Sequence, residues 1–159
     1  MIVLDASVLL AFFDAENEHH AASVVLLEVN DTLGVSSLTL GEILVAPART
    51  GQLDETRAAL RDLDIVELCV PANVGVRLAR LCAATGLQVR DCWALLAAED
   101  AGAAIASFDD RLIRAAAGTS QRIVDLPAPA PIVIPEVRRE PAGDGHNLRI
   151  RNVLRRNIR

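Results

Sequence analysis

Lysine is absent from this chain of 159 residues, in which all 16 basic side chains are arginine. The absence excludes a Walker A phosphate loop and every enzyme that forms a Schiff base on lysine, because both need a primary ammonium group. A GxGxxG pattern after a strand is missing too, so nothing supports dinucleotide binding. Several large enzyme classes are therefore excluded before any motif is considered.

Long apolar runs and paired cysteines are also lacking. No apolar stretch reaches the roughly 18 residues of a membrane-spanning helix, and the N-terminal MIVLDASVLL lacks the basic region and cleavage site of a secretory signal. Cys69, Cys82 and Cys92 lie in apolar stretches without CxxC spacing or a nearby histidine. We therefore expect a cytoplasmic protein without a membrane partner, and buried free thiols rather than a zinc site.

Apolar residues make up 52% of the chain, which is enough for one compact domain with a full core. Charge is unevenly distributed: residues 127–159 hold seven arginines and three acids, a balance of +4, whereas residues 1–126 hold nine arginines and 18 acids, a balance of −9. The segment PAPAPIVIP predicts a stiff, extended linker. We therefore divide the chain into a domain at 1–126 and a Pro-rich linker with an arginine-rich tail at 127–159.

Short β-branched runs alternate with longer segments of helical period. Strands are predicted at residues 2–5, 33–36, 65–69, 103–107 and 122–125. Helices are predicted at residues 7–14, 18–29, 38–50, 53–62, 72–85, 91–101 and 109–117. Pro47 lies inside a helical pattern and predicts a kink or an early stop. The alternation is typical of an α/β fold, a three-layer α/β/α sandwich around a parallel sheet of about five strands.

Carboxylates occur where these strands end or the next helices begin. Asp5 ends the first predicted strand, Glu42 stands early in a helix, Asp91 begins another helix, and Asp109 with Asp110 follows the fourth strand. Active sites of open parallel sheets form beyond the carboxyl ends of the strands, so these acids can share one edge. Taken singly, Asp91 and Asp109 can be N-caps and Glu42 an exposed helix residue. Asp110 is predicted to face solvent and cap the following helix.

Asp5 is the hardest of these acids to explain structurally. A carboxylate directly after Ile-Val-Leu, in a strand covered on both faces, is costly to bury unless it is paired or bound to a cation. Several carboxylates at one edge, with no lysine to neutralise them, suit Mg²⁺ or Mn²⁺. The sequence therefore predicts a divalent metal site there.

The segments IVLDASVLL, SSLTLGEIL and VRDCWALLAAEDAGAAIASFDDRL resemble those of PIN-domain ribonucleases, particularly the VapC toxins of bacterial toxin–antitoxin pairs. The resemblance covers residues 1–126 in order and spacing. It implies a PIN-like fold and a metal-dependent endoribonuclease. Its catalytic acids fall on Asp5, Glu42, Asp91 and Asp109, of which Asp5, Asp91 and Asp109 would bind the metal and Glu42 would bind it or orient the attacking water. Its supporting hydroxyl positions fall on Ser7 and Ser107.

The resemblance also implies an RNA substrate, a homodimer and a VapB-like antitoxin whose C-terminal segment crosses the active-site groove. The sequence also bears on two other functions. A haloacid-dehalogenase-like phosphatase needs a second aspartate two residues after the first, and Ser7 stands there. A non-catalytic PIN-fold module that binds RNA or protein is the alternative that stays open.

Arginines are the candidate RNA contacts. Arg90 either contacts a phosphate or pairs with the adjacent Asp91, and the candidates in the tail are Arg149, Arg151, Arg155 and Arg156. The tail is either a disordered extension without a role, an arm that grips phosphates, or the source of an arginine for the acidic pocket. His19 and His20, which begin a polar helix, are predicted on a solvated face rather than in a metal site.

Overall fold

The computed structural model describes residues 1–28, 31–69, 73–119 and 121–127, and strands alternate with helices along these ranges. The strands are β1 Ile2–Leu4, β2 Leu33–Ser36, β3 Val66–Leu68 and β4 Ala104–Ala106. The helices are α1 Ala6–Phe13, α2 His20–Leu27, α3 Ser37–Thr50, α4 Leu53–Asp62, α5 Val74–Thr85, α6 Val89–Asp100 and α7 Asp110–Gly118. Each predicted helix is observed with small changes at its ends, and the predicted end residues 29 and 72 lie outside the described residues.

The four strands form one parallel sheet in the order β3-β2-β1-β4. The chain moves outward from β1 to β2 and β3, and then returns to place β4 on the other side of β1. The strand order therefore reverses between β1 and β4, the position where open α/β sheets bind ligands. The predicted fifth strand at 122–125 is reduced to a single parallel bridge between Ile105 and Ile123. The α/β fold class is confirmed, with four strands in the described sheet.

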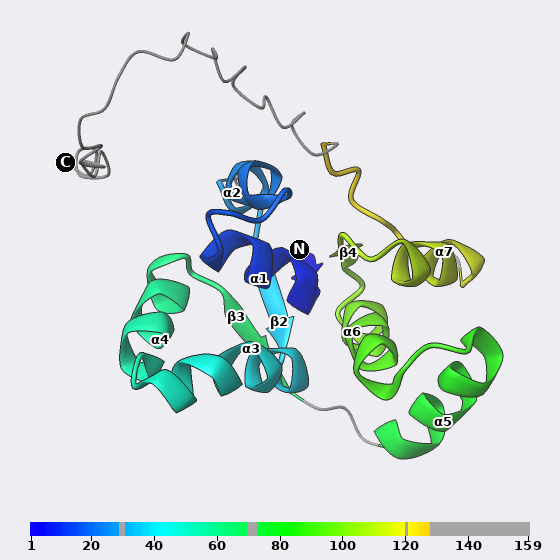
Figure 1. The fold of residues 1–159 in the computed structure, drawn as a ribbon. Coiled ribbons are helices and arrows are strands. Elements are labelled where there is room, and N and C mark those ends of the chain that lie inside the picture. Colours follow the sequence, from blue (N-terminus) through cyan, green and yellow to red (C-terminus); the bar gives the residue numbers. More distant parts are fainter. Residues whose placement is uncertain (29–30, 70–72, 120, 128–159) are drawn as a thin grey trace, which may run out of the picture.

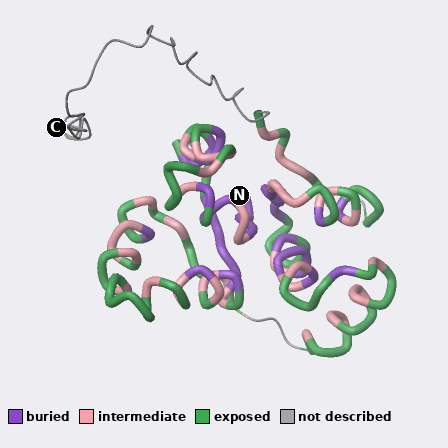
Figure 2. The backbone as a smooth tube through the Cα atoms, viewed as in Figure 1, coloured by how far each residue is buried: buried purple, intermediate pink, exposed green. Residues whose placement is uncertain are grey.

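Helices cover both faces of this sheet (Figure 1). Alternate side chains of β1 enter different cores: Leu4 packs with residues of α1, α2, α3 and α4, whereas Val3 packs with residues of α5, α6 and α7. Figure 2 shows buried residues along the sheet and on the helix sides that face it. Burial on both faces explains why β1 is the uninterrupted apolar run Ile-Val-Leu.

The end of α3 differs from the prediction for Pro47. The helix does not stop there but continues to Thr50, and Gly51 ends it with a left-handed φ of 77°. Proline removes one N–H from the helix, yet its own carbonyl still accepts the N–H of Gln52 at 2.9 Å. The last turn is therefore closed by the glycine and not by the proline.

The cysteines only partly match their prediction. Cys92 is buried, Cys82 is partly exposed and Cys69 is exposed, so the prediction of three buried thiols is wrong for Cys69, which directly follows the edge strand β3. Burial raises the pKa of the Cys92 thiol to about 11, so this side chain stays protonated near neutral pH and acts in packing. All three are free thiols.

None of the helices in the described ranges combines the length and apolar character needed to cross a membrane.

Candidate active site

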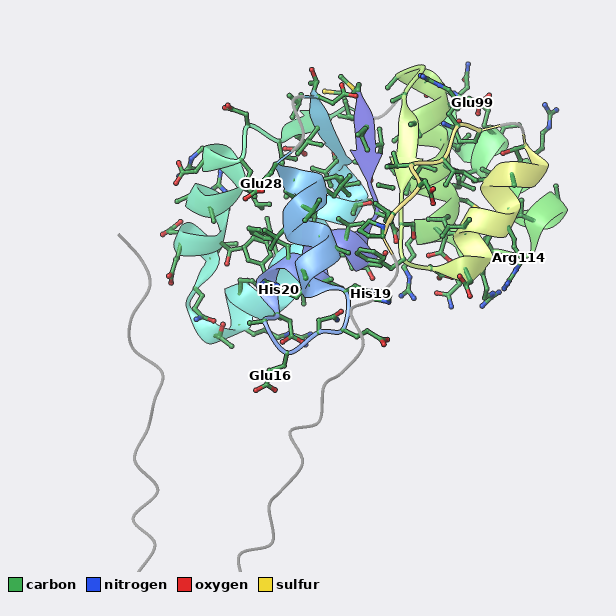
Figure 3. The ribbon with its side chains drawn as sticks, turned by 90° about the horizontal axis from the view of Figure 1, so that it is seen from above. Glu16, His19, His20, Glu28, Glu99 and Arg114 are labelled. Atoms are coloured by element: carbon green, nitrogen blue, oxygen red, sulfur yellow. The ribbon has the colours of Figure 1, made fainter. Side chains whose placement is uncertain are left out.

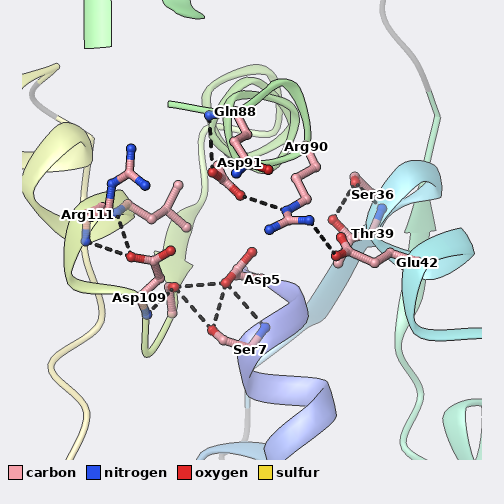
Figure 4. Close-up of polar contacts among 12 residues, drawn as sticks. Asp5, Ser7, Ser36, Thr39, Glu42, Gln88, Arg90, Asp91, Asp109 and Arg111 are labelled. Atoms are coloured by element: carbon pink, nitrogen blue, oxygen red, sulfur yellow. Dashed lines mark hydrogen bonds and ion pairs between the residues drawn. The ribbon is translucent and has the colours of Figure 1, made fainter. Parts of the chain in front are cut away.

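Asp5 lies directly after β1, where it caps the start of α1, and it is 8% exposed. Its Oδ2 atom accepts hydrogen bonds from Ser7 Oγ at 2.7 Å, from Ser107 Oγ at 2.9 Å and from the Ser7 backbone N–H at 3.3 Å. No hydrogen bond from the described residues reaches Oδ1, and Figure 4 shows this free oxygen pointing toward Asp91 and Arg90. The carboxylate is therefore fixed through one oxygen and open at the other.

Ser7, in the first turn of α1, and Ser107, in the loop after β4, connect these two segments. Ser7 Oγ accepts the N–H of Phe108 at 2.9 Å, and Ser107 Oγ accepts the N–H of Asp109 at 2.9 Å. A hydroxyl has one proton to donate, and each of these protons is directed to Asp5 Oδ2. The two predicted supporting residues thus contact Asp5 directly and set its orientation.

Asp109 and Asp91 each lie at the start of a helix. Asp109 is the N-cap of α7, where its Oδ1 accepts the N–H of Arg111 at 2.7 Å and of Leu112 at 3.4 Å. Asp91 lies in the first turn of α6, and its Oδ2 accepts the N–H of Gln88, the N-cap residue, at 3.3 Å. Asp109 therefore has the predicted capping role, and Asp91 supports the cap from inside the helix. Each acid keeps a second oxygen that takes no part in these bonds.

Asp110 is the first residue of α7 and is exposed. Its predicted contact with solvent is observed, but the prediction that it caps α7 is wrong, because Asp109 supplies the cap.

Glu42 lies in the second turn of α3, and Arg90 of α6 reaches across to it. Arg90 Nη1 is 3.6 Å from Glu42 Oε1, and Arg90 Nε is 3.4 Å from Asp91 Oδ1 (Figure 4). The start of α3 is fixed by Ser36, whose Oγ accepts the N–H of Thr39 at 3.0 Å. The Arg90 side chain is 55% exposed and that of Asp91 is 16% exposed. Of the two roles weighed for Arg90, pairing with Asp91 is observed, and Glu42 is a second partner.

The site is an all-oxygen donor set with an excess of negative charge. Figure 4 shows four carboxylates from different elements near one another, those of Asp5, Glu42, Asp91 and Asp109. Among the described residues, Arg90 is the one cation that forms an ion pair with any of them. Oxygen donors suit Mg²⁺ or Mn²⁺ in kind. Within the described residues, however, no three His, Cys, Asp or Glu side chains lie close enough to hold one metal ion as they stand. Binding such an ion therefore requires the carboxylates to move closer together.

His19 differs from its predicted solvated position. Its ring stacks on Phe108 with centroids 4.3 Å apart and an angle of 8° between the planes, and both side chains are half-buried. His20 is also half-buried, with Nδ1 2.9 Å from the carbonyl oxygen of Ala11. Figure 3 shows both histidines at the start of α2. No sequence pattern indicates the stack, since its partners are 89 positions apart.

The family model described as PIN domain matches residues 2–118. The structure is similar to VapC20 of Mycobacterium tuberculosis, described as a sarcin-ricin loop cleaving toxin, with a TM-score of 0.62, 16% identity, and coverage of 72% of this chain and 95% of that one. It is also similar to a toxin–antitoxin complex from Klebsiella pneumoniae, with a TM-score of 0.59, 19% identity and coverage of 69% and 87%. FitAcB from Neisseria gonorrhoeae gives a TM-score of 0.58, 16% identity and coverage of 79% and 97%. At these identities the likeness concerns the fold.

A search of curated proteins finds no match to this chain.

Proposed function

Because the chain belongs to the PIN-domain family, whose model matches residues 2–118, we propose that it is a Mg²⁺- or Mn²⁺-dependent endoribonuclease and the toxin of a toxin–antitoxin pair in the cytoplasm. The observation that carries the proposal is the Asp5 carboxylate: three hydrogen bonds fix one of its oxygens, and the other oxygen points toward Asp91 (Figure 4). A carboxylate that served only as a helix cap would not need two serine hydroxyls, one from the first turn of α1 and one from the loop after β4.

Each residue has a distinct part in this proposal. Asp5, Asp91 and Asp109 hold the cation, and Glu42 either joins them or orients the attacking water. When bound, the cation supplies a nucleophilic water near neutral pH and positive charge against the phosphate. Ser7 and Ser107 keep Asp5 in one orientation, as partners behind a metal ligand commonly do. We assign these roles to a nuclease domain at residues 1–126.

The reaction itself is tested by incubating the purified protein with total RNA and Mg²⁺ and mapping the new RNA ends. We expect new internal ends with Mg²⁺ or Mn²⁺ and none when the cation is chelated by EDTA. A folded protein that binds RNA but makes no new ends with either cation would favour the alternative, a non-catalytic PIN-fold module. One observation favours that alternative: among the described residues, the carboxylates do not lie close enough together to hold one metal ion.

Arg90→Gln is expected to tighten Mn²⁺ binding by roughly two- to tenfold, because it removes a positive charge that pairs with Glu42 and Asp91. Exposed ion pairs contribute up to about 1 kcal/mol each, and about 1.4 kcal/mol is a factor of ten. The measurement is a calorimetric titration with Mn²⁺ without RNA. Arg49→Gln is the control, since Arg49 is exposed near the end of α3 and has no ion pair among the described residues. Unchanged or weaker binding in Arg90→Gln would contradict competition between Arg90 and the cation.

The partners we propose are an RNA substrate, a VapB-like antitoxin and a second copy of the chain. The toxin–antitoxin complex among the similar structures supports the antitoxin. The structure adds a surface groove of about 520 Å³ between α1, α3 and α4, which includes the exposed side chains of Leu10 and Phe13. Residues 128–159, with the tail candidates Arg149, Arg151, Arg155 and Arg156, lie outside the described residues. Their part in RNA binding stays a hypothesis.

A further inference from the structure

A second groove, of about 510 Å³, lies between α7 and the turn that joins α5 to α6. Arg111, Arg114, Thr85 and Thr119 supply its polar side chains, and the rest of the lining is apolar or glycine. No carboxylate lines it. The domain at residues 1–126 has a net charge of −9, so a groove lined only by positive charges differs from the charge of the domain as a whole.

The two arginines of this groove are not neutralised by the protein around them. Neither forms an ion pair within the described residues, where the paired arginines are Arg77 and Arg90. Arg111 donates one long hydrogen bond, at 3.4 Å, to the carbonyl oxygen of Gly86. Arg114 is exposed, and Figure 3 shows it reaching outward from α7. Both positive charges are therefore available to an anionic ligand.

The groove begins at the rim of the candidate active site. The backbone N–H of Arg111 donates to Asp109 Oδ1 at 2.7 Å, and the side chain of Arg111 lies beside Asp109 in Figure 4. From there the groove follows one face of α7 through Arg114 and Ala115 to Gly118. Seven residues of helix rise about 10 Å. A chain held in the groove would thus extend away from the carboxylates along α7.

The other side of α7 has the opposite charge. A groove of about 410 Å³ there is lined by Asp110 and Asp125 and contains no arginine. An anionic chain that leaves the site is therefore attracted to one side of α7 and repelled from the other. Local potentials of this kind direct charged ligands even when the net charge of the protein repels them.

We propose that the groove lined by Arg111 and Arg114 binds the phosphodiester backbone of the RNA strand next to the cleaved bond. This inference rests on the proposed function. Guanidinium groups match phosphate oxygens in geometry and charge, and such contacts position a nucleic acid without reading its sequence. The groove therefore sets the path of the strand, and other parts of the surface select the bases.

The test measures how the binding of a single-stranded RNA depends on salt, in a full-length Asp5→Asn background that does not cut the probe. For single strands the slope of log affinity against log salt changes by about 0.7 for each phosphate contact. We expect Arg114→Gln to reduce the slope by about 0.7 and Arg111→Gln with Arg114→Gln by about 1.4. Arg49→Gln, which removes the same charge from α3, is expected to leave the slope unchanged.

Two negative outcomes distinguish a failure of the groove proposal from a failure of the nuclease proposal. If the Asp5→Asn protein and both groove variants have the same slope and unchanged melting temperatures, the groove proposal is overturned while the nuclease proposal stands. If the protein with Asp5 intact does not cut RNA, and the Asp5→Asn protein binds RNA without any salt dependence, both the groove proposal and the nuclease proposal are overturned. Arg114→Gln keeps the test independent of folding, because no hydrogen bond of the Arg114 side chain to another described residue is lost.

Discussion

Asp5→Asn is expected to lower RNA cleavage on the order of 10³-fold, since losing a metal ligand removes several kcal/mol of charge stabilisation. The substitution keeps the size and shape of the side chain and removes the charge. Its amide oxygen can accept the hydrogen bonds that Ser7 and Ser107 now donate to Asp5 Oδ2. The protein should therefore fold normally while cleavage fails.

Asp5→Ala is the matched comparison, because it removes the acceptor as well as the charge. Two hydroxyls and one backbone N–H then lose their common partner, and unsatisfied buried groups cost about 1–3 kcal/mol. Each kcal/mol lowers the melting temperature of a domain of this size by roughly 2–4 °C. We expect both variants to be inactive and only Asp5→Ala to melt several degrees lower. Mg²⁺-dependent cleavage by Asp5→Asn at the rate of the parent would show that Asp5 is not a ligand.

The acids at the strand ends could be predicted because their signal is local. Asp5 follows an apolar strand, and Asp109 stands between a strand and a helix, so the general geometry of parallel sheets assigns both to one edge. The partners of these acids could not be predicted in the same way. Glu42 and Arg90 are 48 positions apart in the chain and meet only because α3 packs against α6. No periodicity or spacing in the sequence predicts that contact.

The limits of the fold prediction have similar causes. The run at 122–125 has strand composition, but the chain pairs with β4 only at the bridge between Ile105 and Ile123. Composition does not show how long two segments stay side by side. Pro47 predicts a kink or an early stop, yet it lies near the end of α3, and the helix continues to Thr50 and ends at Gly51. The predicted end of this helix at residue 50 is therefore confirmed, and only the effect assigned to Pro47 is wrong, because the effect of a proline depends on its position within the helix.

The groove between α1, α3 and α4 combines apolar contact area with acidic residues. Leu10 is 48% exposed and Phe13 is 42% exposed, although both are large apolar side chains. Asp14 and Glu55 also line the groove. Exposed apolar surface beside polar residues is typical of sites where another protein binds. An antitoxin segment with apolar side chains and an arginine would match this combination, in line with the partner proposed above.

Leu10→Asp with Phe13→Asp is expected to weaken antitoxin binding on the order of 10³-fold, since two anchor side chains contribute about 2 kcal/mol each. Cleavage should persist, because neither residue takes part in the polar contacts of Asp5, Asp91 or Asp109. In a bacterial host, expression of the parent alone should be toxic and co-expression of the product of the adjacent small gene should relieve it. The double variant should stay toxic in both cases.

Val76→Asp is the control for this experiment, because Val76 is an exposed apolar residue on α5, a helix that does not line the groove. It should be toxic alone and neutralised like the parent. Direct titration of the purified proteins measures the affinities, and size-exclusion chromatography of each variant reports its oligomeric state. A double variant that binds the antitoxin like the parent would exclude the groove as the antitoxin site. A double variant that becomes monomeric while it still binds the antitoxin would assign the groove to the contact between two copies of the chain instead.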